Sequence, residues 1–226
     1  MCGRFTLKTP AKQVANLFAG LPDPDFEQSY NIAPSQNVAA VRNEAGTAKW
    51  ARLKWGLIPS WSADPKIGYK MINARSETIA EKPSFSAAFK KRRCLIAADG
   101  FYEWKTVNKK KMPIYIHLKE QQPFFFAGVW EKNSKTETEI ESCTIITTEA
   151  NPLLSPIHHR MPVILPEEHF EMWLDPEFSE RQSLEALLQP YPEEESAYYS
   201  VDPKVNKPGC NDPSCVEPIK EQGSLF

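Results

Sequence analysis

Apolar and polar residues along the middle of the chain follow the patterns of β-strands. Residues 37–42 and 48–55 flank the turn sequence Asn43-Glu44-Ala45-Gly46, which predicts a hairpin. Residues 94–98 form a continuous apolar run, as in a strand that is buried on both faces. Lys109-Lys110-Lys111 is interpreted as a charged hairpin tip. Further strands are predicted at residues 113–118, 124–130, 141–147 and 197–201.

Helical spacing of apolar residues is confined to short segments. Thr9 and Pro10 precede Val14, Leu17 and Phe18, and Gly20 follows, which predicts an amphipathic helix with Thr9 as its N-cap. Other helices are predicted at residues 85–93, 166–174 and 179–188. The basic residues at the end of the 85–93 segment suit a helix C-terminus, whether or not they also contact phosphates.

Length and composition indicate one domain over residues 1–226. The 226 residues are 41% hydrophobic and 25% charged, which is ordinary for a globular protein. No apolar run approaches the roughly 20 residues that cross a bilayer, and the N-terminus lacks the basic-then-apolar pattern of a secretion signal. We therefore expect a cytoplasmic protein without a membrane partner.

Charge is unevenly distributed, although the net charge is only −2. Residues 1–130 contain 20 Lys and Arg against 10 Asp and Glu, whereas residues 131–226 contain 7 against 19. Such asymmetry suggests a polyanion as partner of the basic half. The alternative is that the acidic half only supplies solvated helix faces.

The cysteines do not suggest a disulfide framework or a metal site. Their number is odd and they are scattered, which suits a reducing compartment. Cys210 and Cys215 alone do not make a metal site, and the adjacent His158 and His159 are poor chelating neighbours. No phosphate-binding glycine loop is present, and we expect no cofactor. The five are Cys2, Cys94, Cys143, Cys210 and Cys215.

Cys2 carries the most specific candidate chemistry in the chain. Removal of Met1 would leave an amine and a thiol on adjacent carbons, and this pair condenses with an aldehyde to an imine and then to a thiazolidine. Both groups have ordinary pKa values near neutrality, about 7.7–8.0 for the amine and about 8.5 for the thiol. The alternative interpretation is an unremarkable cysteine at a frayed chain end.

Other candidate groups lie in irregular or strand-end segments. Trp61 is either a core residue or an exposed platform for a base. Asn73, Arg75 and Glu77 occupy alternate positions, so an extended chain would place them on one face, functional or merely solvated. Glu103 follows a buried strand among aromatic residues, which would favour its neutral form.

Four motifs together closely resemble the SRAP family, the SOS response-associated peptidases or abasic-site processing proteins. They are Met-Cys-Gly-Arg-Phe at 1–5, Asn-Ala-Arg-Ser-Glu-Thr at 73–78, Asp-Gly-Phe-Tyr-Glu-Trp at 99–104 and His-His-Arg-Met-Pro at 158–162. Segments 30–34 and 55–61 agree as well, so the resemblance covers nearly the whole chain. It implies recognition of abasic sites in single-stranded DNA and a covalent thiazolidine with the ring-opened sugar.

The resemblance also implies roles for individual residues. Cys2 is the nucleophile after Met1 is removed, and Asn73 orients the open sugar. Glu103 is the acid–base beside the adduct and the helper of its reversal. His158 assists sugar opening, and it is preferred to His159 because of its spacing to Arg160 and Pro162.

DNA contacts are implied for four further positions. Arg4, Arg75 and Arg160 match positions that meet phosphates, and Trp61 matches a position near the bases. Met161 stands where relatives can have a basic residue, so we expect one phosphate contact fewer. The proposed peptidase activity is most easily understood as removal of the residue before Cys2.

Two other functions remain open from the residues. One is a cysteine peptidase that uses Cys2 with His158 as base, and the other is a non-catalytic single-strand binder. For the fold we expect α+β, with a largely antiparallel, barrel-like β core, peripheral helices and a cleft that holds the N-terminus. We expect a monomer.

Overall fold

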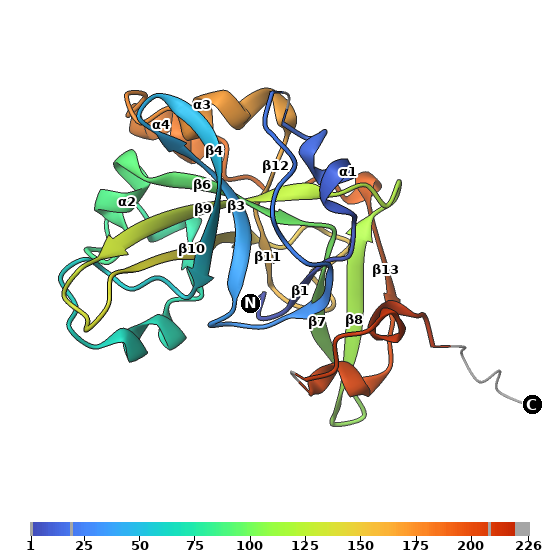
Figure 1. Cartoon of the computed structure of the whole chain (residues 1–226). Coiled ribbons are helices and arrows are strands. Elements are labelled where there is room, and N and C mark those ends of the chain that lie inside the picture. Colours follow the sequence, from blue (N-terminus) through green and yellow to red (C-terminus); the bar gives the residue numbers. More distant parts are fainter. Residues whose placement is uncertain (1, 19, 208, 220–226) are drawn as a thin grey trace, which may run out of the picture.

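Two β-sheets make up most of the molecule (Figure 1). The computed structural model describes residues 2–18, 20–207 and 209–219. Met1, whose removal the sequence analysis expects, lies outside these residues. The prediction of an α+β fold with a largely antiparallel core is confirmed, because parallel pairing occurs in the described residues only where β10 meets β4 and β5.

The larger sheet closes on itself. Its strand order is β11-β10-β4-β3-β6-β9-β12, and β10 also pairs with β9, so five of its strands form a ring. The ring strands are β3 (Asn37–Glu44), β4 (Thr47–Trp55), β6 (Arg93–Ala98), β9 (Phe124–Asn133) and β10 (Ile140–Glu149). The short strands β5 (Asn73–Arg75), β11 (Arg160–Pro162) and β12 (Ile164–Leu165) pair at its margins.

The smaller sheet holds the N-terminus. Its order is β13-β8-β7-β1-β2, and all its pairings are antiparallel. The short β1 therefore lies between two strands from distant parts of the chain. The strands are β1 (Phe5–Leu7), β2 (Ser29–Ile32), β7 (Gly100–Val107), β8 (Lys110–Leu118) and β13 (Ser196–Ser200).

The helices are short and lie at the periphery. They are α1 (Ala11–Ala15), α2 (Ser86–Lys91), α3 (Phe170–Leu174) and α4 (Arg181–Ala186), with 3-10 turns at Pro65–Lys70, Ser76–Thr78, Glu167–His169, Glu193–Glu195, Pro203–Asn206 and Pro213–Val216. Figure 1 shows α2, α3 and α4 around the ring sheet. No helix of the described residues is long and apolar enough to cross a membrane.

Both predicted hairpins are confirmed. In the β3–β4 turn Ala45 and Gly46 have φ angles of 50° and 86°, and in the β7–β8 turn Asn108 and Lys109 have φ angles of 49° and 64°. Two residues of positive φ are typical of the tight turns that match strand twist. The Gly46 amide also donates to Asn43 Oδ1 at 2.9 Å.

Two sequence predictions at helix ends were wrong. Thr9 does not cap α1, because its backbone amide and hydroxyl both donate to Asp99 Oδ2, at 2.6 and 2.8 Å. The segment predicted as a helix to residue 93 ends at Lys91, and Arg93 begins β6. The Arg93 guanidinium is buried and donates to backbone carbonyls, among them Trp173 O at 2.6 Å and Phe89 O at 2.9 Å.

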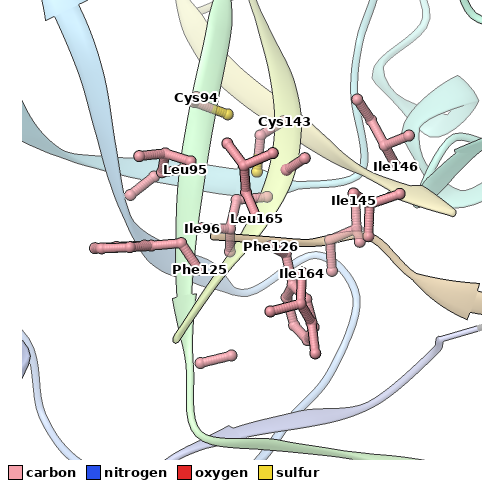
Figure 2. Packing of buried hydrophobic residues seen from close by; sticks show 14 of the residues in the cluster. Cys94, Leu95, Ile96, Phe125, Phe126, Cys143, Ile145, Ile146, Ile164 and Leu165 are labelled. Atoms are coloured by element: carbon pink, nitrogen blue, oxygen red, sulfur yellow. The ribbon is translucent and has the colours of Figure 1, made fainter. Parts of the chain in front are cut away.

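The core fills the ring and joins it to the smaller sheet. Figure 2 shows apolar side chains of β6, β9, β10 and β12 packed together, including Ile96, Phe126 and Ile145. Phe5 of β1 enters the same core, with its ring centroid 5.1 Å from Trp55 and 5.7 Å from Phe126, both edge-on. Burial of a phenylalanine contributes about 1.5–3 kcal/mol, so this side chain anchors the N-terminal strand.

Asp99 is a second anchor of the N-terminal strand. It is fully buried, and it accepts hydrogen bonds from the Thr6 hydroxyl at 2.5 Å and from both donors of Thr9. The Thr6 hydroxyl also lies 3.0 Å from the Tyr115 hydroxyl. The Tyr115 ring packs directly on Gly100, where a Cβ would overlap it. These contacts explain the Asp-Gly pair of the 99–104 motif.

Asp99→Ala is expected to destabilise the protein. It leaves buried donors of Thr6 and Thr9 without their acceptor, at a cost of about 1–3 kcal/mol in the free energy of unfolding. Urea unfolding followed by tryptophan fluorescence measures this loss, with the exposed Asp25→Ala as the matched control. Equal stability of the two variants would contradict the anchoring role.

Candidate active site

Cys2 lies where the two sheets meet, and its side chain is fully buried. The antiparallel register Phe5↔Phe101 and Thr6↔Gly100, continued by a Tyr102 amide bond to Arg4 O at 2.9 Å, carries the N-terminus toward Glu103. Burial raises the pKa of the Cys2 thiol, and the nearby Glu103 carboxyl adds to the effect. The thiol is therefore neutral at physiological pH.

Asn73 connects the N-terminal segment to the ring sheet. Its side-chain amide, at the start of β5, donates to the Cys2 carbonyl at 2.8 Å. Its Oδ1 atom is buried and accepts no hydrogen bond from the described residues. The amide thus fixes Cys2 with one end and offers an acceptor with the other.

Glu103 is held on β7 with 4% of its surface exposed. Burial is the main cause that raises the pKa of its carboxyl. The aromatic residues of the 99–104 motif point elsewhere: the Tyr102 hydroxyl donates to Tyr30 O at 2.7 Å, and Trp104 Nε1 donates to Asn206 Oδ1 at 2.7 Å. The desolvated acid that the sequence predicts is therefore present, and its proton is retained above the ordinary range of a glutamate.

His158 directly precedes β11 and is half-buried. The Arg160 amide lies 3.0 Å from its Nδ1. Nδ1 also lies 3.2 Å from the Arg160 carbonyl oxygen, so the backbone of Arg160 fixes the orientation of the imidazole ring. Burial lowers the pKa of the imidazole, which favours the neutral form. The His159 ring stacks on it with centroids 4.5 Å apart.

β10 brings these groups to one region of the sheet. It pairs with β5 on one side and with β11 on the other, and Thr147 is in register with both Arg75 and Pro162. The strand of Asn73 and the strand that follows His158 are thus neighbours of the same strand. Cys2 reaches this region through its bond to Asn73.

The implied DNA-contacting residues have different surroundings. Arg75 is exposed, and Trp61 is 53% exposed. Arg4 is partly buried and donates to Asn31 Oδ1 at 2.8 Å and to Val205 O at 3.0 Å. The interpretation of Trp61 as a core residue was therefore wrong.

Arg160 is buried and paired with Glu77. Its guanidinium makes two contacts to the Glu77 carboxylate, at 2.5 and 3.0 Å, and donates to Thr147 O at 2.5 Å. The expectation that Glu77 continues the face of Asn73 and Arg75 was wrong, because β5 ends at Arg75 and the chain turns into a 3-10 turn at Ser76–Thr78. This turn places Glu77 against Arg160.

Asn31 is a site residue whose role the sequence analysis missed. It is buried, and its amide nitrogen donates to three carbonyls of the C-terminal segment, Val205 O, Lys207 O and Cys210 O, at 3.1, 3.2 and 2.7 Å. Its oxygen accepts from Arg4. The only signal in the sequence was the Tyr30-Asn31-Ile32-Ala33-Pro34 segment, interpreted as a possible pocket lining. The carbonyl partners of its amide nitrogen lie more than 170 residues away.

The structure is thus that of a small α+β protein in which Cys2 is held by the Asn73 amide, beside the desolvated acid Glu103, where two sheets meet. The family described as SOS response associated peptidase (SRAP) matches residues 1–208. The chain belongs to the SRAP family.

Named relatives and solved structures agree with this assignment. The chain is 46% identical over 222 residues to the abasic site processing protein YoqW of Bacillus subtilis, covering 96% of this chain and 99% of that protein. It is 34% identical to the abasic site processing protein HMCES of Xenopus tropicalis, over 86% of this chain and 67% of that protein. A crystal structure of a Bacteroides thetaiotaomicron protein superposes with a TM-score of 0.86 at 28% identity, covering 97% of this chain and all of that one.

Proposed function

We propose that this protein recognises abasic sites in single-stranded DNA and joins them covalently through Cys2, once Met1 is removed, as a thiazolidine. The observation that carries the proposal is the fixed position of Cys2 between the Asn73 amide and the Glu103 carboxyl. The names of the relatives support the lesion as substrate.

The reaction begins at the amine of Cys2. Because burial keeps the thiol protonated, the neutral amine attacks the aldehyde of the ring-opened sugar first and gives a carbinolamine. Glu103, whose pKa is raised by burial, donates its proton to the departing hydroxyl. Water leaves, an iminium (a protonated imine) remains, and Glu103 is left as a carboxylate. The buried Asn73 Oδ1 is placed to accept a hydrogen bond from a sugar hydroxyl.

In the ring closure Glu103 acts as a base, whereas it acts as an acid in the first step. The Glu103 carboxylate accepts the thiol proton as sulfur attacks the iminium carbon, and the nitrogen, which kept its proton in the iminium, becomes the thiazolidine amine. The net change is one aldehyde and one aminothiol converted to a thiazolidine and water. Reversal runs through the same proton transfers, so Glu103 serves both directions. His158, with a neutral ring, accepts the hydroxyl proton when the closed sugar opens.

Glu103→Gln is expected to slow crosslinking about 100-fold, the usual contribution of a general acid–base. In the native protein the rate should also fall as pH rises through the raised pKa of Glu103, because only the protonated carboxyl donates. Glutamine does not ionise, so this fall disappears in the variant. Single-turnover crosslinking rates measured against pH check both effects, and an unchanged profile would exclude Glu103 as the acid.

Arg75→Ala is expected to weaken DNA binding, whereas Arg160→Ala is expected to lower the stability of the protein. Exposed Arg75 contacts phosphate, so its loss lowers the slope of log affinity against log salt by about 0.7 for a single strand. The melting temperature should not change. Arg160→Ala leaves Glu77 and a β10 carbonyl without their donor, and is expected to cost about 1–3 kcal/mol of stability. Salt titrations of DNA binding and thermal unfolding of both variants separate the two roles. A loss of stability in Arg75→Ala together with a lower salt slope in Arg160→Ala would contradict these roles.

Base contacts are assigned to exposed aromatic side chains. Trp61 and Tyr69 are 53% and 66% exposed. Tyr69 lines a small cavity of about 80 Å³ together with Lys54 and Lys66. Aromatic faces flanked by cations suit single strands without sequence preference.

Peptidase activity is confined in this proposal to removal of the residue before Cys2. A cysteine peptidase acts through its thiolate, whereas burial keeps this thiol neutral. A denaturing gel with a single-stranded oligonucleotide tests the main proposal. A slow band that requires the abasic site supports it, and cleavage of an added peptide without such a band favours the peptidase.

A further inference from the structure

The C-terminal segment brings two thiols and a carboxylate together. Cys210 Sγ lies 3.2 Å from Cys215 Sγ and 3.8 Å from Asp212 Oδ2. The three atoms all lie within 4.8 Å of one another. We propose that Cys210, Asp212 and Cys215 form a binding site for a thiophilic divalent cation of the Zn²⁺ type. This proposal does not depend on the proposed function.

The spacing of the three atoms fits a tetrahedral ion. With Zn–S bonds of about 2.3 Å and a Zn–O bond of about 2.1 Å, tetrahedral angles place two sulfur atoms about 3.8 Å apart and sulfur and oxygen about 3.6 Å apart. The observed sulfur–oxygen separation of 3.8 Å is close to this value, whereas the two sulfur atoms, at 3.2 Å, would move apart by about half an ångström when an ion binds. A disulfide needs about 2.05 Å, so the thiols are closer to the spacing of metal ligands.

The carboxylate is already oriented as a ligand. Asp212 Oδ1 accepts from the Ser214 amide at 2.9 Å and from the Ser214 hydroxyl, which leaves Oδ2 directed toward Cys210. Lys204 donates in turn to the Ser214 hydroxyl. Such outer hydrogen bonds fix the orientation of metal ligands and raise affinity.

The backbone of the site is held by the rest of the fold. Asn31 donates to the Cys210 carbonyl at 2.7 Å, and the Tyr102 hydroxyl lies 3.3 Å from the Cys215 carbonyl. Cys215 is fully buried, whereas Cys210 is partly exposed and gives an ion access from solvent. Three protein ligands leave the fourth position for water. Each thiol releases its proton to solvent as it binds.

Metal binding would also stabilise the C-terminal loop that is connected to Arg4, one of the residues implied to contact DNA. The Asn31 amide that holds Cys210 also accepts from Arg4. The ion would therefore fix a loop to which Arg4 is connected through one side chain. The sequence analysis set the two cysteines aside because their spacing supplies only two ligands, and Asp212 becomes the third only when the loop folds.

Titration of the reduced, full-length protein with Co²⁺ tests the site. Thiolate ligation gives a sulfur-to-cobalt charge-transfer band, and Zn²⁺ should abolish it by displacement. The titration is repeated in a Cys2→Ala background, because the freed amine and thiol of Cys2 also chelate metals. We expect one ion per chain in this background and no band in Cys210→Ser. Ser214→Ala should weaken the affinity about 10- to 100-fold.

Two results would overturn the proposal. One is the absence of a charge-transfer band in protein whose thiols are shown to be reduced. The other is a band that persists in both Cys210→Ser and Cys215→Ser. Because Cys210 is partly exposed, the fold of its serine variant is checked by a metal-free melting temperature equal to that of the parent.

Discussion

Cys2→Ser is expected to lose the heat-stable crosslink to an abasic oligonucleotide, by at least about 1,000-fold, as for removal of other covalent nucleophiles. Serine keeps the N-terminal amine but replaces the thiol that closes the ring. The amine should still form an imine with the aldehyde, and this imine hydrolyses on denaturation. Borohydride added before denaturation should therefore restore a band in the variant.

Two controls make this result specific to the thiol. An intact oligonucleotide should give no band with either protein. Cys143→Ser removes a second buried thiol, in β10, and should retain crosslinking if the variant folds. A heat-stable band in Cys2→Ser without borohydride would refute the thiazolidine mechanism, because no thiol would remain at the reacting carbon.

The β framework was predictable because local patterns specify it. The apolar run at residues 94–98 is β6, and all six residues of that strand are buried. The turn around Gly46 requires positive φ angles, and the sequence places suitable residues there. Fold class follows from many short strands with few helices. The closure of the larger sheet through β10 was beyond local patterns, since it depends on pairings between distant segments.

Side-chain partners were harder to predict than strands. Thr9 has the residue type and position of a helix cap, yet Asp99 is a stronger acceptor and lies ninety residues further along. Glu77 continues an alternating pattern in the sequence, yet in the structure it lies in a 3-10 turn, where its carboxylate pairs with the buried Arg160. In both places a long-range charged partner replaces the local choice. Such partners decide how the N-terminus and β5 are positioned.

The 99–104 motif shows why the sequence could predict which residues belong to the candidate site but not how they are arranged in space. Asp99 holds the N-terminal strand, Gly100 admits Tyr115, and Glu103 faces Cys2. Adjacent residues of one strand alternate between its two faces. A six-residue segment thus serves both anchoring and chemistry, and only the folded register separates the two tasks.

A chain that retains any residue before Cys2 is expected to form no thiazolidine. An amide nitrogen is not nucleophilic, so an acylated Cys2 lacks the amine that attacks the aldehyde even though its thiol is unchanged. The design is a cleavable N-terminal extension whose removal by a site-specific protease leaves Cys2 first. Before cleavage we expect no crosslink on a denaturing gel, and after cleavage a full one, with mass spectrometry verifying each N-terminus. The same extension on Cys2→Ser should give no heat-stable band at either stage. Crosslinking by the uncleaved chain would mean that the thiol acts without the amine, and would replace the thiazolidine by another adduct.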